Sequence, residues 1–146
     1  MATITRTRTT SRLASTAGPS VLRLAIVVLT LATAGIHAYL GGLLFLANAA
    51  GYAALALAMV LPGPFAAFRW LVRLALAGFT AGTIGAWFLF GTRFSLAYLD
   101  KGLEAALIGL IVIELFLHDG GPRGILAKAR GLFATVRGRL TPGNVG

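Results

Sequence analysis

Long uncharged segments dominate the chain. Residues 24–68 contain no Asp, Glu, Lys or Arg, and a second such segment covers residues 74–92. A third, residues 105–117, is interrupted only by Glu114. An α-helix rises about 1.5 Å per residue and the apolar core of a bilayer is roughly 30 Å thick, so one crossing takes about 20 apolar residues. The first segment therefore has the length of two crossings, and the pattern predicts an all-α membrane protein.

Glycine and proline positions divide these segments into four predicted spans. Gly41 and Gly42 interrupt the first segment, Pro62 ends its second half, and Gly91 follows the next apolar run. Proline cannot continue a helix, and glycine is a poor residue for a helix interior. We therefore expect a four-helix transmembrane bundle over residues 21–118. Its spans lie at about residues 21–40, 43–61, 70–90 and 96–117.

The basic residues are distributed unevenly about these spans. All of them except Arg93 and Lys101 fall on one side. Cytoplasmic loops carry the excess of Lys and Arg, so we expect both termini in the cytoplasm. The Arg-, Ala- and Gly-rich composition is typical of a bacterial protein, and the expected location is the inner (plasma) membrane. The net charge of +9 flanks apolar spans, which favours anionic lipids as partners and argues against nucleic acid.

The two ends of the chain are polar. Residues 1–20 are rich in Thr, Ser and Arg and contain no acid, so we expect a disordered, basic cytoplasmic tail. Residues 141–146 are expected to form a flexible tail. A signal peptide is an alternative for the first segment, with residues 24–31 as its apolar region and cleavage after Ala34. The apolar character continues past that site, which favours an uncleaved span.

Residues 124–140 show a second kind of pattern. At about 100° per residue, their apolar side chains gather on one face and basic side chains flank that face. An amphipathic helix of this kind lies in the membrane interface, with its cations at the lipid phosphates. The alternative is a helix that covers the cytoplasmic end of the bundle. The expected headgroup contacts are Lys128, Arg130, Arg137 and Arg139.

Small residues recur at helical spacing within the predicted spans. Lipid is as apolar as leucine, so transmembrane helices associate through close backbone approach and polar contacts. We expect the glycines to pack helices together, within one chain or against another copy or another membrane subunit. The positions concerned are Gly51, Gly78, Gly82, Gly85, Gly102 and Gly109.

Polar side chains inside the spans are the candidates for function, because an ionisable group there costs about 3 kcal/mol or more. The turn at Gly41 and Gly42 sets His37 and Asn48 at similar depth. The predicted polar cluster comprises His37, Asn48, Tyr52, Glu104 and Glu114.

Each of these side chains also has an explanation that involves no function. Asn48 and Tyr52 can simply hydrogen-bond between helices. Asp100, Lys101 and Glu104 can lie at the outer water boundary. Glu114 can pair with Arg73 or Arg23 near the cytoplasmic end.

Several kinds of chemistry are disfavoured. The absence of cysteine removes disulfides and thiolate sites. His37 and His118 are expected about 20 Å apart along the helices, too far to ligate one haem iron. We expect no catalytic residue, no metal and no cofactor. The expected function is a non-enzymatic accessory or scaffold component of a membrane assembly. The alternative is a small transporter or proton conductor that uses His37, Glu104 and Glu114.

The segment IHAYLGGLLFLANAAGY, residues 36–52, is similar to small four-span bacterial integral membrane proteins of unassigned function. The resemblance covers mainly the first two spans. It implies a four-span fold and no activity.

Overall fold

A computed structural model describes residues 21–140, apart from the side chains of residues 64–65 and 139–140. The predicted tails, residues 1–20 and 141–146, and the side chain of Arg139 lie outside this description. All regular structure in the described part is helical, which confirms the all-α prediction. Its elements are α1 (Val21–Leu40), α2 (Leu43–Val60), the 3-10 helix η1 (Gly63–Phe68), α3 (Arg69–Phe90), α4 (Ser95–Asp119) and α5 (Gly121–Leu140).

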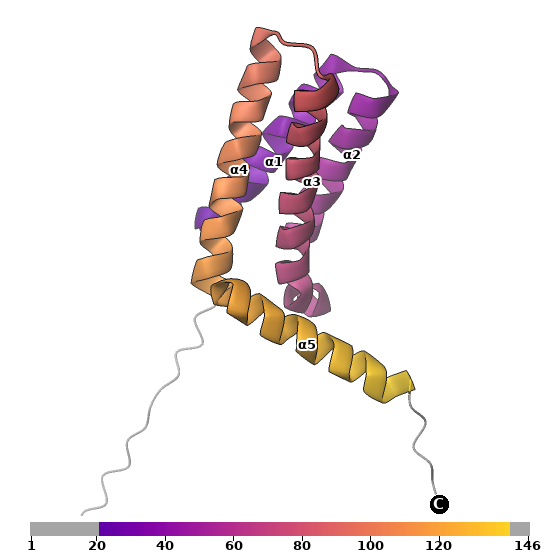
Figure 1. Cartoon of the computed structure of the whole chain (residues 1–146), viewed down its shortest axis with the longest axis vertical. Coiled ribbons are helices and arrows are strands. Elements are labelled where there is room, and N and C mark those ends of the chain that lie inside the picture. The colour runs from indigo at the N-terminus through magenta and orange to yellow at the C-terminus, as the bar shows by residue number, and fades with distance from the viewer. Residues whose placement is uncertain (1–20, 141–146) are drawn as a thin grey trace, which may run out of the picture.

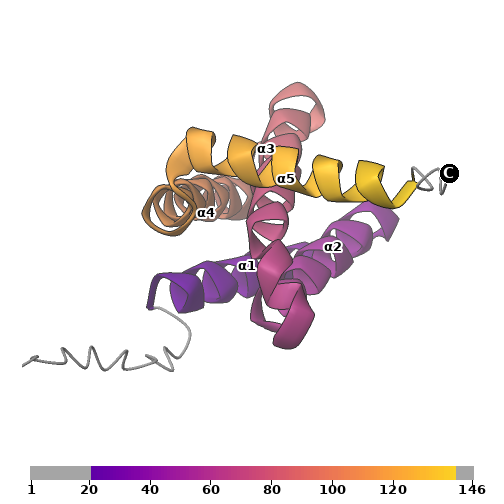
Figure 2. The same ribbon diagram turned by 90° about the horizontal axis from the view of Figure 1, so that it is seen from below.

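Helices α1 to α4 run side by side as a bundle, and α5 leaves its lower end at an angle (Figure 1). The α1–α2 and α3–α4 connections lie at the upper end. The first of these is only two residues long, because Gly41 and Gly42 adopt φ values of 69° and 81°, a region that glycine enters without strain. The start of α1, η1 and the α4–α5 junction lie at the lower end, as the view from below also shows (Figure 2).

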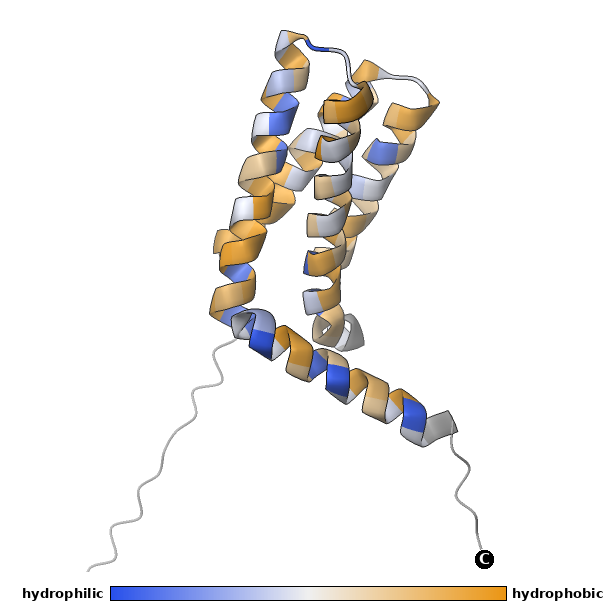
Figure 3. Ribbon diagram, viewed as in Figure 1, coloured by the Kyte–Doolittle hydropathy of each residue, from blue (hydrophilic) through white to orange (hydrophobic). Residues whose placement is uncertain are grey.

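The centre of the bundle is apolar and its outer surface is apolar as well. The buried centre contains Ile26, Met59, Leu76, Leu107 and Ile111, all 0% exposed. Many other large apolar side chains point outward, and hydrophobic residues cover most of the ribbon of α1 to α4 (Figure 3). A soluble monomer rarely exposes so large an apolar surface. A bilayer solvates such a surface well.

Three helical segments are long and apolar enough to cross a membrane: Val21–Leu40, Leu43–Val60 and Ala66–Phe90. Helix α4 has 25 residues but carries more charged residues than these three. Its acidic side chains are buried against the other helices: Asp100, Glu104, Glu114 and Asp119. The opposite side of α4 is apolar, because Phe116 and Leu117 are 60% and 70% exposed.

The glycines proposed for helix packing behave differently from one another. A Cβ at Gly51 would lie 2.7 Å from the ring of Phe79, so α2 and α3 approach closely there. At the other five positions a Cβ would meet none of the described residues within 4 Å, so the structure shows no close helix approach there: Gly78, Gly82, Gly85, Gly102 and Gly109.

The α4–α5 junction is sharper than the sequence indicated. Helix α4 ends at Asp119, its C-cap Gly120 adopts a left-handed conformation with φ 73°, and α5 begins at the residue after this cap. Residue 124 was the expected start. The earlier start is possible because Gly121 also has positive φ, 63°, and turns the chain without an intervening loop.

Candidate functional site

Side chains from all four bundle helices meet below the upper end. We call them the upper cluster: His37 of α1, Tyr52 of α2, Thr83 of α3, and Asp100, Lys101 and Glu104 of α4. On α4 the two acids are four residues apart, so they share one helix face. That face points into the bundle, since Asp100 and Glu104 are 2% and 0% exposed. The two carboxylates are therefore enclosed by protein side chains.

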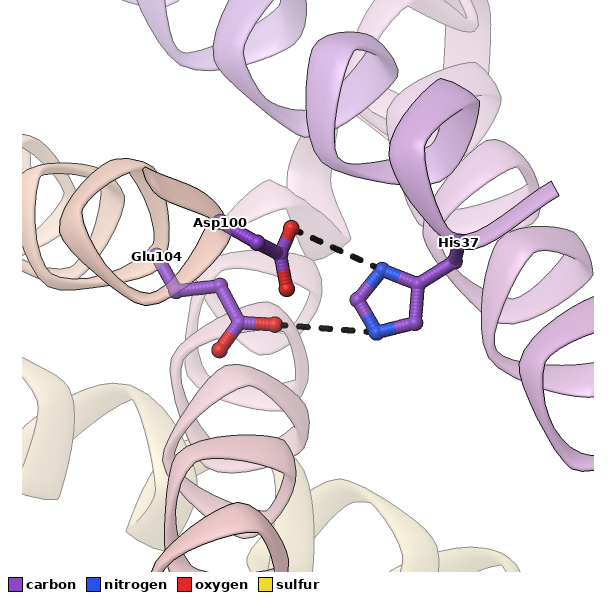
Figure 4. A group of neighbouring side chains, drawn as sticks. All are labelled: His37, Asp100 and Glu104. Carbon is purple, nitrogen blue, oxygen red and sulfur yellow. Dashed lines mark ion pairs between the residues drawn. The ribbon is translucent and has the colours of Figure 1, made fainter. Parts of the chain in front are cut away.

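The imidazole of His37 faces the two carboxylates of α4, with one ring nitrogen toward each of them (Figure 4). Its Nδ1 is 3.7 Å from Asp100 Oδ1, and its Nε2 is 4.0 Å from Glu104 Oε1. Nδ1 is also 3.0 Å from the carbonyl oxygen of Thr33, an acceptor, so Nδ1 carries a hydrogen and donates it. The other ring nitrogen, Nε2, faces Glu104.

The hydroxyl groups near Glu104 have more close oxygen neighbours than hydrogens to donate. The Tyr52 hydroxyl donates to Glu104 Oε1 at 2.9 Å. The Thr83 hydroxyl lies 2.9 Å from the same oxygen and 2.8 Å from the Thr80 carbonyl oxygen. The Tyr52 and Thr83 hydroxyl oxygens are also 2.9 Å apart. Each hydroxyl has one hydrogen, so two hydrogens cannot serve all these contacts at once. The Tyr52 and Thr83 hydroxyl hydrogens can therefore be shared among Glu104 and the neighbouring oxygens.

The charges of the upper cluster do not balance. Lys101 Nζ is 2.6 Å from Glu104 Oε2 and 3.0 Å from Asp100 Oδ2, so one ammonium serves two carboxylates. With a neutral His37 the cluster carries one net negative charge. One more proton, on Nε2 or on a carboxylate, makes it neutral.

The same residues offer ligands for a metal ion. His37, Asp100 and Glu104 each supply one ligand atom within 4.8 Å of the others, and such nitrogen and oxygen donors suit Zn²⁺. However, Lys101 already supplies a cation to both carboxylates. A divalent ion would leave the cluster with a net positive charge, whereas one proton makes it neutral. Charge balance thus favours a proton.

A cavity of about 740 Å³ lies beside the upper cluster. Asp100, Lys101 and Thr83 line it together with Asn48, and the remaining wall is largely aromatic and aliphatic. This volume lies in the range of small-molecule sites. Asn48 is half-buried on this wall, so of the predicted cluster residues it belongs to the cavity.

Glu114 belongs to a different group of charges at the lower end, which we call the lower network. Arg73 Nη2 donates to Glu114 Oε1 at 2.9 Å, and Arg23 Nε is 3.6 Å from the same oxygen. Arg73 Nη1 also donates to Asp119 Oδ2, which is 2.5 Å away. Glu114 lies about 15 Å from Glu104 along α4 by helical rise. Its assignment to one cluster with His37 is therefore wrong, whereas the expected pairing with Arg73 or Arg23 is found with both.

The predicted headgroup contacts on α5 do not form one group. Lys128 donates to Asp119 Oδ1 at 2.5 Å and joins the lower network. Arg130 and Arg137 are exposed. Sequence reasoning did not assign Thr83 to the cluster. Its position three residues after Thr80 on a hydroxyl-bearing face of α3 was the available signal.

Comparison of the chain with protein-family models, with curated proteins and with solved structures finds no match. The functional assignment therefore depends on the geometry described above.

Proposed function

We propose that the protein is a small transporter that binds and releases a proton at the upper cluster. The observation that carries the proposal is the buried imidazole of His37, which faces Asp100 and Glu104 beside the hydroxyl groups of Tyr52 and Thr83. Ionisable groups inside a membrane are most often retained for function. The adjacent cavity supports access of water or a small molecule to Asp100 and Lys101.

The proposal includes α4 as a fourth membrane span, with both termini in the cytoplasm. The inward direction of the α4 acids and its exposed apolar side support this. The connections at Gly41 and near Arg93 are then external, and the lower network is near the cytoplasm. This orientation follows the expected excess of basic residues on the inner side.

We further propose a carrier rather than an open pore. The upper cluster and the lower network are separated by the fully buried side chains of Ile26, Leu76, Leu107 and Ile111. A proton or solute cannot pass such a layer without water or a helix movement. Arg73 holds Glu114 in an ion pair, and arginine does not release its proton. Transport therefore requires a conformational change that exposes the upper cluster to the other side.

Proteoliposomes test this proposal. Purified protein is reconstituted in vesicles that contain a pH-sensitive dye, and a pH step is applied with valinomycin and potassium to clamp the voltage. We expect protein-dependent proton movement that His37→Gln and Glu104→Gln abolish. Tyr52→Phe should slow it, because it removes a hydrogen-bond donor to Glu104.

Tyr39→Phe is the matched control, since Tyr39 is 82% exposed and lies on the same helix as His37. It should leave the rate unchanged. Equal rates in wild-type and His37→Gln vesicles, or in protein-free vesicles, would exclude the transporter. The remaining candidate is then the accessory role. The projection of α5 away from the bundle favours it, because Phe133 there is 74% exposed and available to a partner subunit.

A further inference from the structure

A second cavity, of about 300 Å³, lies at the lower end of the bundle. The start of α1, the start of α3 and the α4–α5 junction surround it. We call it the lower cavity. Its charged lining consists of Arg23, Arg69, Arg73, Lys128 and Asp119.

Positive charge around the lower cavity exceeds negative charge. Four cationic side chains line it, and the acids that pair with them are Asp119 and Glu114. Within the described residues Arg69 forms no ion pair, and its Nη2 donates only to the Leu61 carbonyl at 3.2 Å. The four cationic side chains therefore exceed the two acids by about two charges.

Donor groups at this cavity are also unused. Arg73 is 4% exposed, and its two terminal nitrogens donate to Glu114 and Asp119. Its Nε has no hydrogen-bond partner among residues 21–140, and neither does the buried Nε of Arg69. Buried polar atoms normally have a partner, so two orphaned guanidinium donors at a cationic cavity indicate an anion. Guanidinium groups match the geometry of phosphate oxygens.

We propose that the lower cavity binds the phosphate of an anionic phospholipid. A lipid is favoured over free phosphate because the surrounding surface is apolar. Val21, Phe68 and Leu117 are 84%, 45% and 70% exposed near this end and can contact acyl chains. The apolar segments Val21–Leu40 and Ala66–Phe90 both begin here, which is the depth of a headgroup. Basic pockets between transmembrane helices commonly hold anionic headgroups.

Native mass spectrometry of the full-length protein in mild detergent tests the proposal. Phosphatidylglycerol is titrated against phosphatidylcholine with the same acyl chains, since both contain a phosphate but only the first is anionic. Wild-type protein should prefer phosphatidylglycerol. Arg69→Gln should weaken this binding about fivefold, since one basic residue contributes about 1 kcal/mol at an anionic lipid surface. Arg69→Lys should retain most of it.

Arg130→Gln is the matched control, because it removes the same charge from an exposed position outside the cavity, where any headgroup contact is diffuse surface attraction and not binding at the lower cavity. It should change the affinity less than twofold. Equal effects of Arg69→Gln and Arg130→Gln would overturn the site and leave only diffuse attraction. Displacement of the lipid by inorganic phosphate at equal concentration would overturn the assignment to a lipid.

A second variant distinguishes loss of lipid binding from loss of folding. Ala67 lines the lower cavity and is exposed, so Ala67→Glu adds the missing counter-charge without filling the core. We expect it to raise the melting temperature of the lipid-free protein and to weaken phosphatidylglycerol binding at least as much as Arg69→Gln. Unchanged lipid binding by this variant would contradict the proposal. The upper cluster is not involved, so proton movement tests a separate question.

Discussion

At the scale of single residues, Glu104 is the centre of the upper cluster. Its Oε1 accepts hydrogen bonds from Tyr52 and Thr83, and its Oε2 accepts one from Lys101. Phe79 also orients the ring of Tyr52. The two rings pack edge to face, with their centroids 4.9 Å apart. The carboxylate thus connects α4 to α2 and α3, and it faces His37 of α1. Buried polar networks of this kind are sensitive to the loss of any member.

A double-mutant cycle measures the interaction of His37 with Glu104. Each of His37→Ala and Glu104→Gln should lower the free energy of unfolding in detergent. The double variant should lose less than the sum, because the first change already removes the shared interaction. We expect a coupling of about 0.5–3 kcal/mol.

The control cycle pairs His37→Ala with Glu114→Gln, which belongs to the lower network. These changes should be additive to within about 0.5 kcal/mol. Additive losses in the His37 and Glu104 cycle would show that the two side chains do not interact.

At the scale of elements, the α4–α5 junction connects α5 to the lower network. Lys128 of α5 and Arg73 of α3 both donate to Asp119 at the end of α4. The turn needs glycine at particular places. A Cβ at Gly124 would collide with the carbonyl oxygen of Asp119, whereas a Cβ at Gly131 would meet nothing within 4 Å.

Two alanine substitutions on α5 should therefore have opposite effects. Gly124→Ala should destabilise the junction by about 1–3 kcal/mol, since backbone must move to make room. Gly131→Ala should stabilise α5 by up to about 1 kcal/mol through helix propensity. The rate of trypsin cleavage within α5 reports its local unfolding, and it should rise for the first variant and fall for the second. The same rate for both variants would contradict the tight turn.

At the scale of the whole molecule, the bundle has an apolar outside and two polar interiors at different depths. Exposed apolar side chains suit lipid, and buried charges form ion pairs near each end. This arrangement explains how α4 can be a span although its charges exceed those of the three apolar segments.

Reporter fusions test the proposed topology. Fusions after Pro64 and after Gly146 should behave as cytoplasmic, and a fusion after Arg93 as external. The reason is the excess of basic residues at the lower end. An external signal after Pro64 would reverse the orientation. An intact mass that lacks residues 1–34 would instead support cleavage of a signal peptide.

The sequence by itself determined the helical class, because the lengths of the apolar segments and the glycine and proline positions are local properties. The turn at Gly41 and Gly42 was predictable because only glycine adopts such φ values easily. The grouping of His37 with Glu104 was also predictable in part, since helical rise sets the depth of each residue.

Only the tertiary structure decided which faces meet. The rotation of each helix about its axis depends on packing, and it buried Asp100 with His37 while Asn48 was placed on the wall of a cavity. It left five glycines at which an added Cβ would touch none of the described residues within 4 Å. The lower cavity likewise combines residues from the start of α1, the start of α3 and the start of α5, whose distances from one another depend on the whole fold. Periodicity describes each helix separately, so it cannot supply the contacts between helices.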